Sequence, residues 1–483
     1  MSTAPNPEPT MRAVLDRLGI AEAPLASTAD PVSFMRALSS AGTSLATKPT
    51  QMVAANTRMA LGVAAATRAA LGRAIGLQTA GPVSPVAGDK RFNDAAFAQN
   101  PLYFLIAQQY LLSNQLVTEL LDAASLDVGV DEKARFAAKF LLDAMAPTNT
   151  LPGNPAAIRE AFDSGGKSLV RGARNMLGDL RHNGGWPSQV DGSGFEVGVN
   201  MAATPGTVVY RSELIELIQY EPQVKRVHSV PLLFLPPWIN TYYIMDLAPG
   251  KSLIEWAVQH GHTCFAVSYR NPDASMRDLG FADYLVQGPL DAVRVVREIT
   301  GAPEVNTLSV CLGGTLTAMA LAYNAAIGDS SIKSATFLNT HTDFTTPGTL
   351  GVFTDEATIA GLEKEMAKKG YLDSGKMAHT FDALRANDLV FQYVINNWLL
   401  GKKPPSFDLL VWNKDSTRMP AKMHSEYLRA CYLRNDFARG EFVVDGIKLD
   451  PGKIDIDTYV LAAVDDHIVP WVSGYKTTQL FGG

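Results

Sequence analysis

The sequence predicts an α/β protein in which a mostly parallel sheet, covered by helices on both faces, follows a helical N-terminal domain. After about residue 195, short apolar β-rich runs alternate with helical stretches, which is the pattern of a covered parallel sheet. Residues 89–184 instead carry apolar residues at three- and four-residue spacing, as amphipathic helices do. A cysteine between small residues also stands where one apolar run turns helical, at 309–313. We therefore expect two parts of different structural class.

Length, charge and cysteine content exclude several classes of structure and function. A chain of 483 residues is too long for one small core. The net charge of −6 gives no general attraction to nucleic acid. The three cysteines have no paired spacing, so they predict neither a disulfide framework nor a zinc site. The N-terminus lacks the order of a secretory signal, and no run reaches the ~20 apolar residues of a membrane span. We expect a cytoplasmic protein with no metal, no cofactor and no transmembrane segment.

Residues 1–87 read as an N-terminal arm and linker, rich in Ala, Pro, Ser and Thr and ending in "TAGPVSPVAGD". No acidic residue occurs between Asp30 and Asp89. Within this stretch, residues 52–76 carry Arg and apolar residues at roughly helical spacing. Such a cationic amphipathic helix can lie on a lipid or polymer surface or dock on a partner. The alternative is a weakly ordered Ala-rich arm.

The next two parts are separated by a break in the pattern. Residues 88–194 are expected to form the helical domain, and the Gly- and Pro-containing stretch "RHNGGWPSQVDGSG" ends it. Residues 195–483 carry the strand-like runs "TVVYRS", "VPLLFLPPWI", "TCFAVSY", "NTLSV", "SATFLNTH" and "DTYVLAAVD". The alternation is interrupted at about 345–450. An insertion of this size before the last strand predicts a cap or lid over the active edge of the sheet.

The stretch "SVCLGGT" matches a nucleophile elbow. In the α/β-hydrolase fold a G-x-S-x-G motif places the nucleophile on a sharp strand-to-helix turn. Here Ser309 and Gly313 are the small flanking residues and Cys311 is the apex. The sequence therefore predicts an α/β-hydrolase fold with a cysteine nucleophile, whose pKa we expect the following helix N-terminus to lower. The alternative is a buried structural thiol, which is our interpretation of Cys264 and Cys431.

The partners of a nucleophile should stand at the ends of other strands. "TYVLAAVDDHIVPW" ends an apolar strand in acidic residues. Asp466 is our choice for the triad acid, with Asp465 less favoured and Asp343, after "SATFLNTH", as a second candidate. The alternative is that these aspartates only cap turns.

An oxyanion hole needs two backbone N–H groups. The first is expected from Leu312, directly after the nucleophile. The second is expected from the loop after "VPLLFL", where Ile239 is the favoured donor and Trp238 is its neighbour.

Several motifs together resemble the polyhydroxyalkanoate synthases. They are "PLLFLPPWINTYYIMDL", "AVSYRNPDASM", "SVCLGGTLTAMALA", "FDLLVWNKD" and "DDHIVPW", and the helical part adds "DKRFNDAAFAQNPLYFLIAQQYLL" and "SGGKSLVRGARNML". The resemblance runs from about residue 89 to the end. It implies polymerisation of (R)-3-hydroxyacyl-CoA, with 3-hydroxybutyryl-CoA as the expected monomer, into polyester. It also implies Cys311 as the acylated nucleophile, Asp466 as the triad aspartate, a homodimer, and granule-associated partner proteins at a granule surface.

The sequence departs from that family at two points. Ser309 stands where the family usually has Gly. The family's catalytic histidine lies in a "GHI" segment some tens of residues after the "DHIVPW" motif, whereas this sequence ends at Gly483. His467 adjoins Asp466, and neighbouring side chains diverge, so we do not expect it to serve as the base. The resemblance thus implies a synthase sequence truncated at its C-terminal end, and it leaves the activity of the 483-residue chain open.

A thiol suits this chemistry better than a hydroxyl. Transfer of an acyl group from a CoA thioester to Cys311 makes a second thioester, and attack by a 3-hydroxyl then forms the more stable oxygen ester. A cap must exclude water from this intermediate, and Trp398 and Trp412 could line such a channel or simply pack the cap. Two other functions remain open. One is a Cys-variant esterase, thioesterase or depolymerase on the same fold. The other is an inactive granule- or partner-binding chain.

Overall fold

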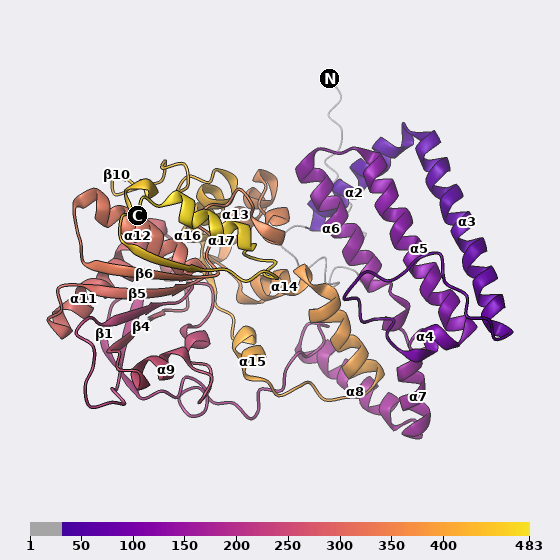
Figure 1. Ribbon diagram of the computed structural model, residues 1–483, viewed down its shortest axis with the longest axis horizontal. Helices are drawn as coiled ribbons and strands as arrows, with labels where there is room; N and C mark the ends of the chain where they lie inside the picture. Colours follow the sequence, from indigo (N-terminus) through magenta and orange to yellow (C-terminus); the bar gives the residue numbers. More distant parts are fainter. Residues whose placement is uncertain (1–30) are drawn as a thin grey trace. The chain divides into compact units, whose positions relative to one another are not determined.

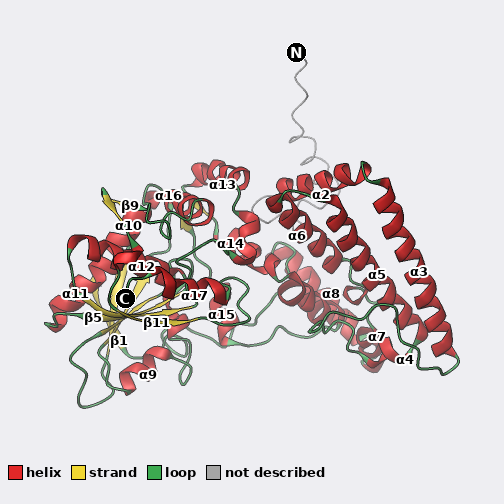
Figure 2. Ribbon diagram, turned by 45° about the horizontal axis from the view of Figure 1, so that its top comes forward, coloured by secondary structure: helices red, strands yellow, loops and turns green. Residues whose placement is uncertain are grey.

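The computed structural model describes residues 31–483, and these form two compact units. The helical unit holds the described residues up to Asp191 together with His379–Pro405, and the α/β unit holds Gly192–Ala378 and Ser406–Gly483. Figure 2 shows that the strands are confined to the α/β unit. No helix within residues 31–483 is both long and apolar enough to cross a membrane. The predicted combination of a helical region and an α/β sheet is confirmed.

The helical unit is built from long helices that begin at identifiable signals. Proline occupies the first turn of α3, α5 and α7, where a missing N–H costs nothing. The side chains of Asn100 and Asn154 accept backbone N–H bonds at the starts of α5 and α7. The helices are α2 (Pro31–Ala46), α3 (Pro49–Ala74), α4 (Ala95–Gln99), α5 (Pro101–Ala124), α6 (Val128–Ala144), α7 (Pro155–Asp163) and α8 (Lys167–His182), with η1 (Pro147–Asn149), η6 (Asn387–Phe391) and η7 (Val394–Leu399).

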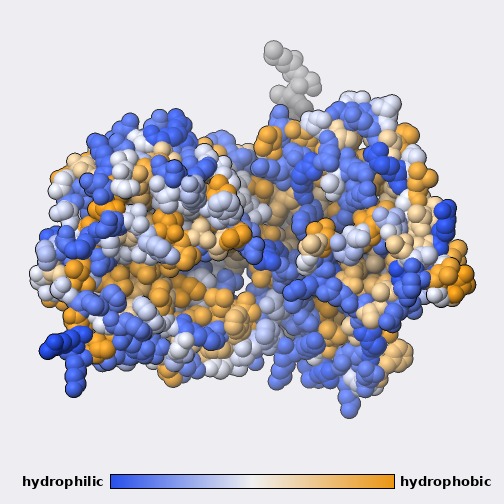
Figure 3. Space-filling view, viewed as in Figure 1, coloured by the Kyte–Doolittle hydropathy of each residue, from blue (hydrophilic) through white to orange (hydrophobic). Residues whose placement is uncertain are grey.

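The Ala-rich part of the expected arm forms two packed helices, and α3 confirms the amphipathic helix that was predicted there as the alternative to a weakly ordered arm. Figure 1 shows α3 running beside α5. Ala69 and Ala70 of α3 are buried against Phe104 of α5, and α2 packs through alanines on α5 and α6. Alanine makes this possible because its small side chain lets two helix backbones approach closely. Apolar residues remain on the outer side of α3, as Figure 3 shows along its edge. Residues 1–30 of the expected arm lie outside the described part of the chain.

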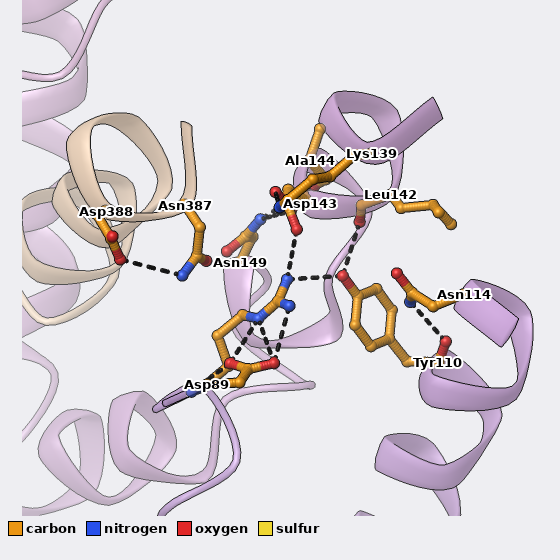
Figure 4. A network of polar contacts seen from close by, with 11 residues as sticks. Asp89, Tyr110, Asn114, Lys139, Leu142, Asp143, Ala144, Asn149, Asn387 and Asp388 are labelled. Atoms are coloured by element: carbon orange, nitrogen blue, oxygen red, sulfur yellow. Dashed lines mark hydrogen bonds and ion pairs between the residues drawn. The ribbon is translucent and has the colours of Figure 1, made fainter. Parts of the chain in front are cut away.

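A buried ionic network holds the segment before α4 to the core of this unit (Figure 4). The Arg91 guanidinium donates to Asp89 at 2.9 Å, to Asp143 of α6 at 2.8 Å and to the Tyr110 hydroxyl of α5 at 2.7 Å. The Asp143 carboxylate also pairs with Lys139 one turn earlier. Buried charges are tolerated when they are paired and hydrogen-bonded. Arg91 therefore joins three separate segments of the helical unit.

The α/β unit contains a seven-stranded sheet in the order β1-β2-β4-β3-β5-β6-β11. The contiguous strands β4, β3, β5, β6 and β11 are parallel, and β1 and β2 are antiparallel additions at one edge. The central strands are apolar and nearly continuous in burial, as in a sheet covered on both faces. The strands are β1 (Gly206–Arg211), β2 (Ile215–Tyr220), β3 (Leu232–Leu235), β4 (Cys264–Tyr269), β5 (Val305–Val310), β6 (Ile332–Leu338) and β11 (Asp457–Leu461).

Helices cover this sheet on both sides, with α9 and α12 on opposite faces in Figure 1. The helices of the unit are α9 (Leu253–Gln259), α10 (Phe281–Leu285), α11 (Asp291–Thr300), α12 (Leu312–Ile327), α13 (Glu356–Lys369), α14 (Ser374–Leu384, which ends in the helical unit), α15 (Asp408–Lys414), α16 (Ala421–Tyr427) and α17 (Trp471–Leu480). Shorter turns are η2 (Tyr242–Met245), η3 (Ala274–Met276), η4 (Val286–Leu290), η5 (Gly348–Phe353), η8 (Leu428–Leu433) and η9 (Pro451–Lys453). Two small ribbons pair β7 (Tyr371–Leu372) with β8 (Met419–Pro420) and β9 (Val443–Val444) with β10 (Ile447–Lys448).

The segment at 345–450, which we expected to form one cap, is divided between the two units. Residues 379–405 cluster with the helical unit, whereas α13, α15, α16 and η8 belong to the α/β unit. Helix α16 packs on α10 and α13, and both flank it within the α/β unit. The cap assignment and the boundaries at 88 and 195 remain predictions.

Candidate active site

Cys311 lies at a strained turn between β5 and α12. Its backbone has φ 51° and ψ −122°, a conformation that L-residues avoid at a cost of about 1–3 kcal/mol. The Cys311 N–H donates to the carbonyl of Leu338 at the end of β6, at 2.9 Å. The residue therefore occupies the apex of a strand-to-helix elbow, at the carboxyl edge of the parallel strands.

The residues on each side of Cys311 show why the turn needs small side chains. A Cβ atom on Gly313 would lie 2.2 Å from the Leu235 carbonyl oxygen and 2.6 Å from that of Pro236. Ser309 is fully buried, yet its hydroxyl donates to the Thr336 carbonyl of β6 at 3.0 Å. The serine therefore fits the turn because its one polar atom has a partner in the neighbouring strand.

The two expected oxyanion-hole residues come from adjacent segments. Leu312 opens α12, and its N–H contacts the Cys311 sulfur. Ile239 lies in the loop after β3. This loop begins at Leu235 and Pro236, whose carbonyl oxygens lie close to Gly313. Among residues 31–483, neither of these backbone N–H groups donates to a backbone carbonyl. An oxyanion hole needs such N–H groups without a main-chain acceptor, and the assignment of Leu312 and Ile239 to it remains a prediction.

Asp466 lies in the loop after β11 and faces the same edge of the sheet. Its Oδ1 atom accepts the N–H groups of Ile468 at 2.9 Å and Val469 at 3.0 Å, so it does cap its own turn. Its charge also acts on Cys311 and raises the pKa of that thiol. The structure therefore brings Asp466 and Cys311 close enough for direct electrostatic interaction.

Asp343, the second acid candidate, is held in other contacts. Its Oδ1 atom accepts the Thr345 N–H at 2.7 Å and the Asn435 side-chain amide at 2.9 Å. Despite its partial burial, these donors and Lys476 lower the pKa of the carboxyl. Turn capping explains Asp343 without a catalytic role.

His341 is a buried residue of this region to which the sequence analysis gave no role. It follows β6, and its Nδ1 and Nε2 atoms lie 2.7 Å from the Ser473 hydroxyl and 2.9 Å from the Ile468 carbonyl. Burial lowers the pKa of the ring. Because both nitrogens have partners, His341 joins β6 to the Asp466 loop and to α17 as a structural residue. Its place at the end of a strand, in "FLNTH", was the available signal.

Two tyrosines that sequence reasoning did not single out lie near Cys311. The Tyr427 and Tyr432 hydroxyls of α16 and η8 lie 3.4 Å apart, and both phenols interact electrostatically with Cys311. Trp238 packs edge-on against Tyr427 with ring centroids 5.5 Å apart. Burial raises the pKa of both tyrosines. Cys311 is thus partly buried beside two phenol side chains.

The two tryptophans expected to line a channel have other partners. The Trp398 indole donates to Asp179 within the helical unit at 2.7 Å. The Trp412 indole donates to the Thr241 carbonyl at 2.9 Å. Their contacts match the packing interpretation of these residues.

The pKa of Cys311 is shifted in the direction opposite to our expectation. Burial raises it to about 11, Asp466 adds to the rise, and the Leu312 N–H opposes it. A helix N-terminus lowers a thiol pKa, but removal of the thiolate from water is the larger effect here. At neutral pH, roughly one molecule in ten thousand would carry the thiolate. The residue therefore needs a base to react quickly.

Comparison with known proteins identifies the family. A sequence model for the N-terminus of poly-beta-hydroxybutyrate polymerase (PhaC) matches residues 88–257, and a model for the alpha/beta hydrolase fold matches residues 231–483. A poly(3-hydroxyalkanoate) polymerase of Methylorubrum extorquens is 43% identical over 90% of this chain and 72% of its own length. The chain belongs to this polymerase family. The polymerase subunit PhaC of Rhizobium meliloti is 39% identical over 95% of the chain and 76% of that protein, so the polymerase likeness extends through both units.

Proposed function

We propose that this chain polymerises (R)-3-hydroxyacyl-CoA into polyhydroxyalkanoate with release of CoA, through a covalent thioester on Cys311. The observation that carries the proposal is the strained elbow at Cys311 in a chain of the polymerase family. The matching N-terminal model is named for the hydroxybutyrate polymer, which supports 3-hydroxybutyryl-CoA as the monomer. Asp466, Leu312 and Ile239 are proposed to assist the reaction.

In the first step, the Cys311 sulfur attacks the thioester carbonyl carbon of the monomer. A bond forms between that carbon and Sγ, the bond to the CoA sulfur breaks, and the thiol proton passes through a base to the departing CoA thiolate. The carbonyl oxygen carries negative charge in the intermediate. The N–H groups of Leu312 and Ile239 are proposed to donate to that oxygen, an effect worth about 2.7–4 kcal/mol per donor in comparable enzymes.

In the second step, a 3-hydroxyl oxygen attacks the acyl carbon on Cys311. An oxygen ester forms, the carbon–Sγ bond breaks, and the hydroxyl proton returns through the base to the sulfur. The thioester keeps the acyl group activated until this point, so each elongation runs downhill. The apolar surroundings from Tyr427, Tyr432 and Trp238 would limit attack by water on the intermediate.

Asp466 is proposed to orient a base rather than to stabilise the thiolate. Its charge raises the pKa of Cys311, so on its own it disfavours ionisation of the sulfur. The family resemblance implies a histidine as that base. His341 does not fit the role, because its ring nitrogens contact Ser473 and Ile468. A homodimer and attachment to the polymer granule are further proposals that rest on the family resemblance.

The test is to supply 3-hydroxybutyryl-CoA to the 483-residue chain and to follow CoA release, polymer and free acid separately. We expect polymer, and no CoA release by the Cys311→Ala variant. Free 3-hydroxybutyrate without polymer would make the chain a hydrolase on the same fold. Association with polymer granules without any Cys311-dependent turnover would favour a non-catalytic binding protein. Either result would overturn the proposal.

A further inference from the structure

Helix α8 is amphipathic, but its faces are reversed relative to an ordinary surface helix. The side packed into the helical unit is small and polar. It carries Ser168, Gly172, Asn175 and Asp179, spaced four, three and four residues apart. Ser168, Gly172 and Asp179 are buried, and Asn175 donates to the carbonyls of residues 397 and 402. The side turned away from the unit carries the apolar residues.

The polar contacts of the inner face fix this orientation. Asp179 accepts the indole N–H of Trp398 at 2.7 Å. A Cβ atom on Gly172 would lie 1.9 Å from the Trp398 carbonyl oxygen, so the backbones of α8 and η7 are in direct contact there. The helix cannot turn its apolar side inward without breaking these bonds. Its apolar side chains are therefore exposed because of how the helix is anchored.

The outer face combines an apolar stripe with a row of cations. Val170, Leu177 and Leu180 are 63%, 47% and 54% exposed, and Leu169, Ala173 and Met176 are also exposed on this side. Lys167, Arg174 and Arg181 recur every seven residues, so they form one row along the border of the stripe. Within residues 31–483 none of these three cations forms an ion pair with an acidic side chain.

We propose that this face of α8 docks on an anionic phospholipid surface. An apolar stripe bordered by Lys and Arg is the pattern of a helix that lies in the plane of a lipid interface, with the apolar side chains among the acyl chains and the cations at the phosphates. A neutral polyester surface would contact the stripe but would give the unpaired cation row no counter-charge. The charge pattern therefore favours lipid over polyester as the occupant.

The experiment is flotation of the full 483-residue chain with vesicles of phosphatidylcholine alone and with vesicles containing phosphatidylglycerol. We expect binding to the anionic vesicles, and salt should weaken it because the lipid charge is screened. The double variant Arg174→Gln/Arg181→Gln should bind roughly 30-fold more weakly, at about fivefold per cation. The variant Leu177→Glu should also lose binding.

A matched control is Leu102→Glu. Leu102 is 64% exposed on α5 of the same unit, and α5 contains no Lys or Arg. This variant should bind like the wild type, and circular dichroism of all variants should show unchanged helix content.

Three results would overturn the proposal. They are binding to polyester particles but not to anionic vesicles, equal binding to neutral and anionic vesicles, and a change of oligomeric state in the α8 variants without lipid binding.

Discussion

Two opposing effects meet at the sulfur of Cys311. The N-terminus of α12 favours the thiolate, whereas burial and the Asp466 carboxylate disfavour it and raise the pKa to about 11. The sequence motif predicts the turn, because small residues at 309 and 313 are visible in it. The sign of the pKa shift could not be predicted, because it depends on Tyr427 and Tyr432, more than a hundred residues further along the chain.

Removing the proposed triad acid Asp466 is predicted to make the Cys311 thiol more reactive toward an alkylating reagent. Replacing Asp466 by Asn removes a negative charge near the sulfur, so the pKa of Cys311 should fall. Alkylation of Cys311 by iodoacetamide at pH 8.5 should become about two- to tenfold faster, which corresponds to a pKa change of up to one unit. The measurement is the rate of mass increase by intact-protein mass spectrometry. Asp465→Asn, at the neighbouring exposed position, is the control, and an unchanged or slower rate in D466N would contradict the account.

A second prediction concerns the close contact at Gly313. In Gly313→Ala, the new Cβ atom would press on the Leu235 and Pro236 carbonyls and displace the loop that carries Ile239. We expect a loss of acyl transfer of about 100-fold or more and a fall of about 1–3 kcal/mol in the free energy of unfolding. The control is Gly361→Ala in α13, where a Cβ atom meets nothing within 4 Å. Full activity of G313A would show that the loop is not held by this contact.

Among the secondary-structure elements, those with strong periodicity were predictable and those with weak signals were not. The spacing of apolar residues indicates α5 and α6, and the apolar runs indicate β3 to β6 and β11. Residues 52–76 were expected to form a cationic amphipathic helix, with a weakly ordered arm as the alternative, and α3 confirms the helix. Helix α2 was expected only as part of the arm, because alanine-rich sequence carries little hydrophobic contrast. The alanines of α2 and α3 are buried by residues of α5 and α6. This packing depends on tertiary structure and has no signal in the local sequence. The division of the 345–450 segment between two units also has no local signal.

The segment 379–405 gives an element-level prediction through Asp382. This carboxyl is buried in α14, and burial raises its pKa to about 6, with the Gln189 side chain opposing the rise. Because its folded-state pKa lies above the unfolded value of about 4, the group stabilises the fold most at low pH, and that contribution is lost as the pH rises through about 6. Asp382→Asn should therefore unfold like the wild type near pH 4 and be more stable by roughly 1–3 kcal/mol at pH 7.5.

The measurement is urea unfolding at the two pH values. Circular dichroism is the readout, because most of the helix in the described part of the chain belongs to the helical unit. Asp388→Asn is the control, since Asp388 lies on the surface of the same segment in an ion pair with Arg385. Equal stabilisation of D382N at both pH values, or destabilisation at pH 7.5, would contradict a raised pKa at Asp382.

At the level of the whole molecule, the α/β unit carries Cys311, the proposed nucleophile, whose acyl intermediate would define the proposed reaction. The parallel strands bring the Cys311 elbow, the loop of Ile239 and the Asp466 turn to one edge of the sheet. Three segments, of which the first and last named residues are 227 positions apart (466 − 239), thus meet because each follows a parallel strand. The order of motifs in the sequence predicted this meeting, whereas the contacts of His341 did not follow from it.

The measurement that tests the central claim most directly is acylation of the 483-residue chain by 3-hydroxybutyryl-CoA, read as intact-protein mass. The account predicts a mass increase of one hydroxybutyryl group on the wild type and none on Cys311→Ala. It also predicts faster acylation at pH 9 than at pH 7, because the raised pKa of Cys311 keeps the thiol protonated at neutral pH. An adduct that persists in C311A, or no adduct on the wild type at either pH, would contradict the assignment of Cys311 as the nucleophile.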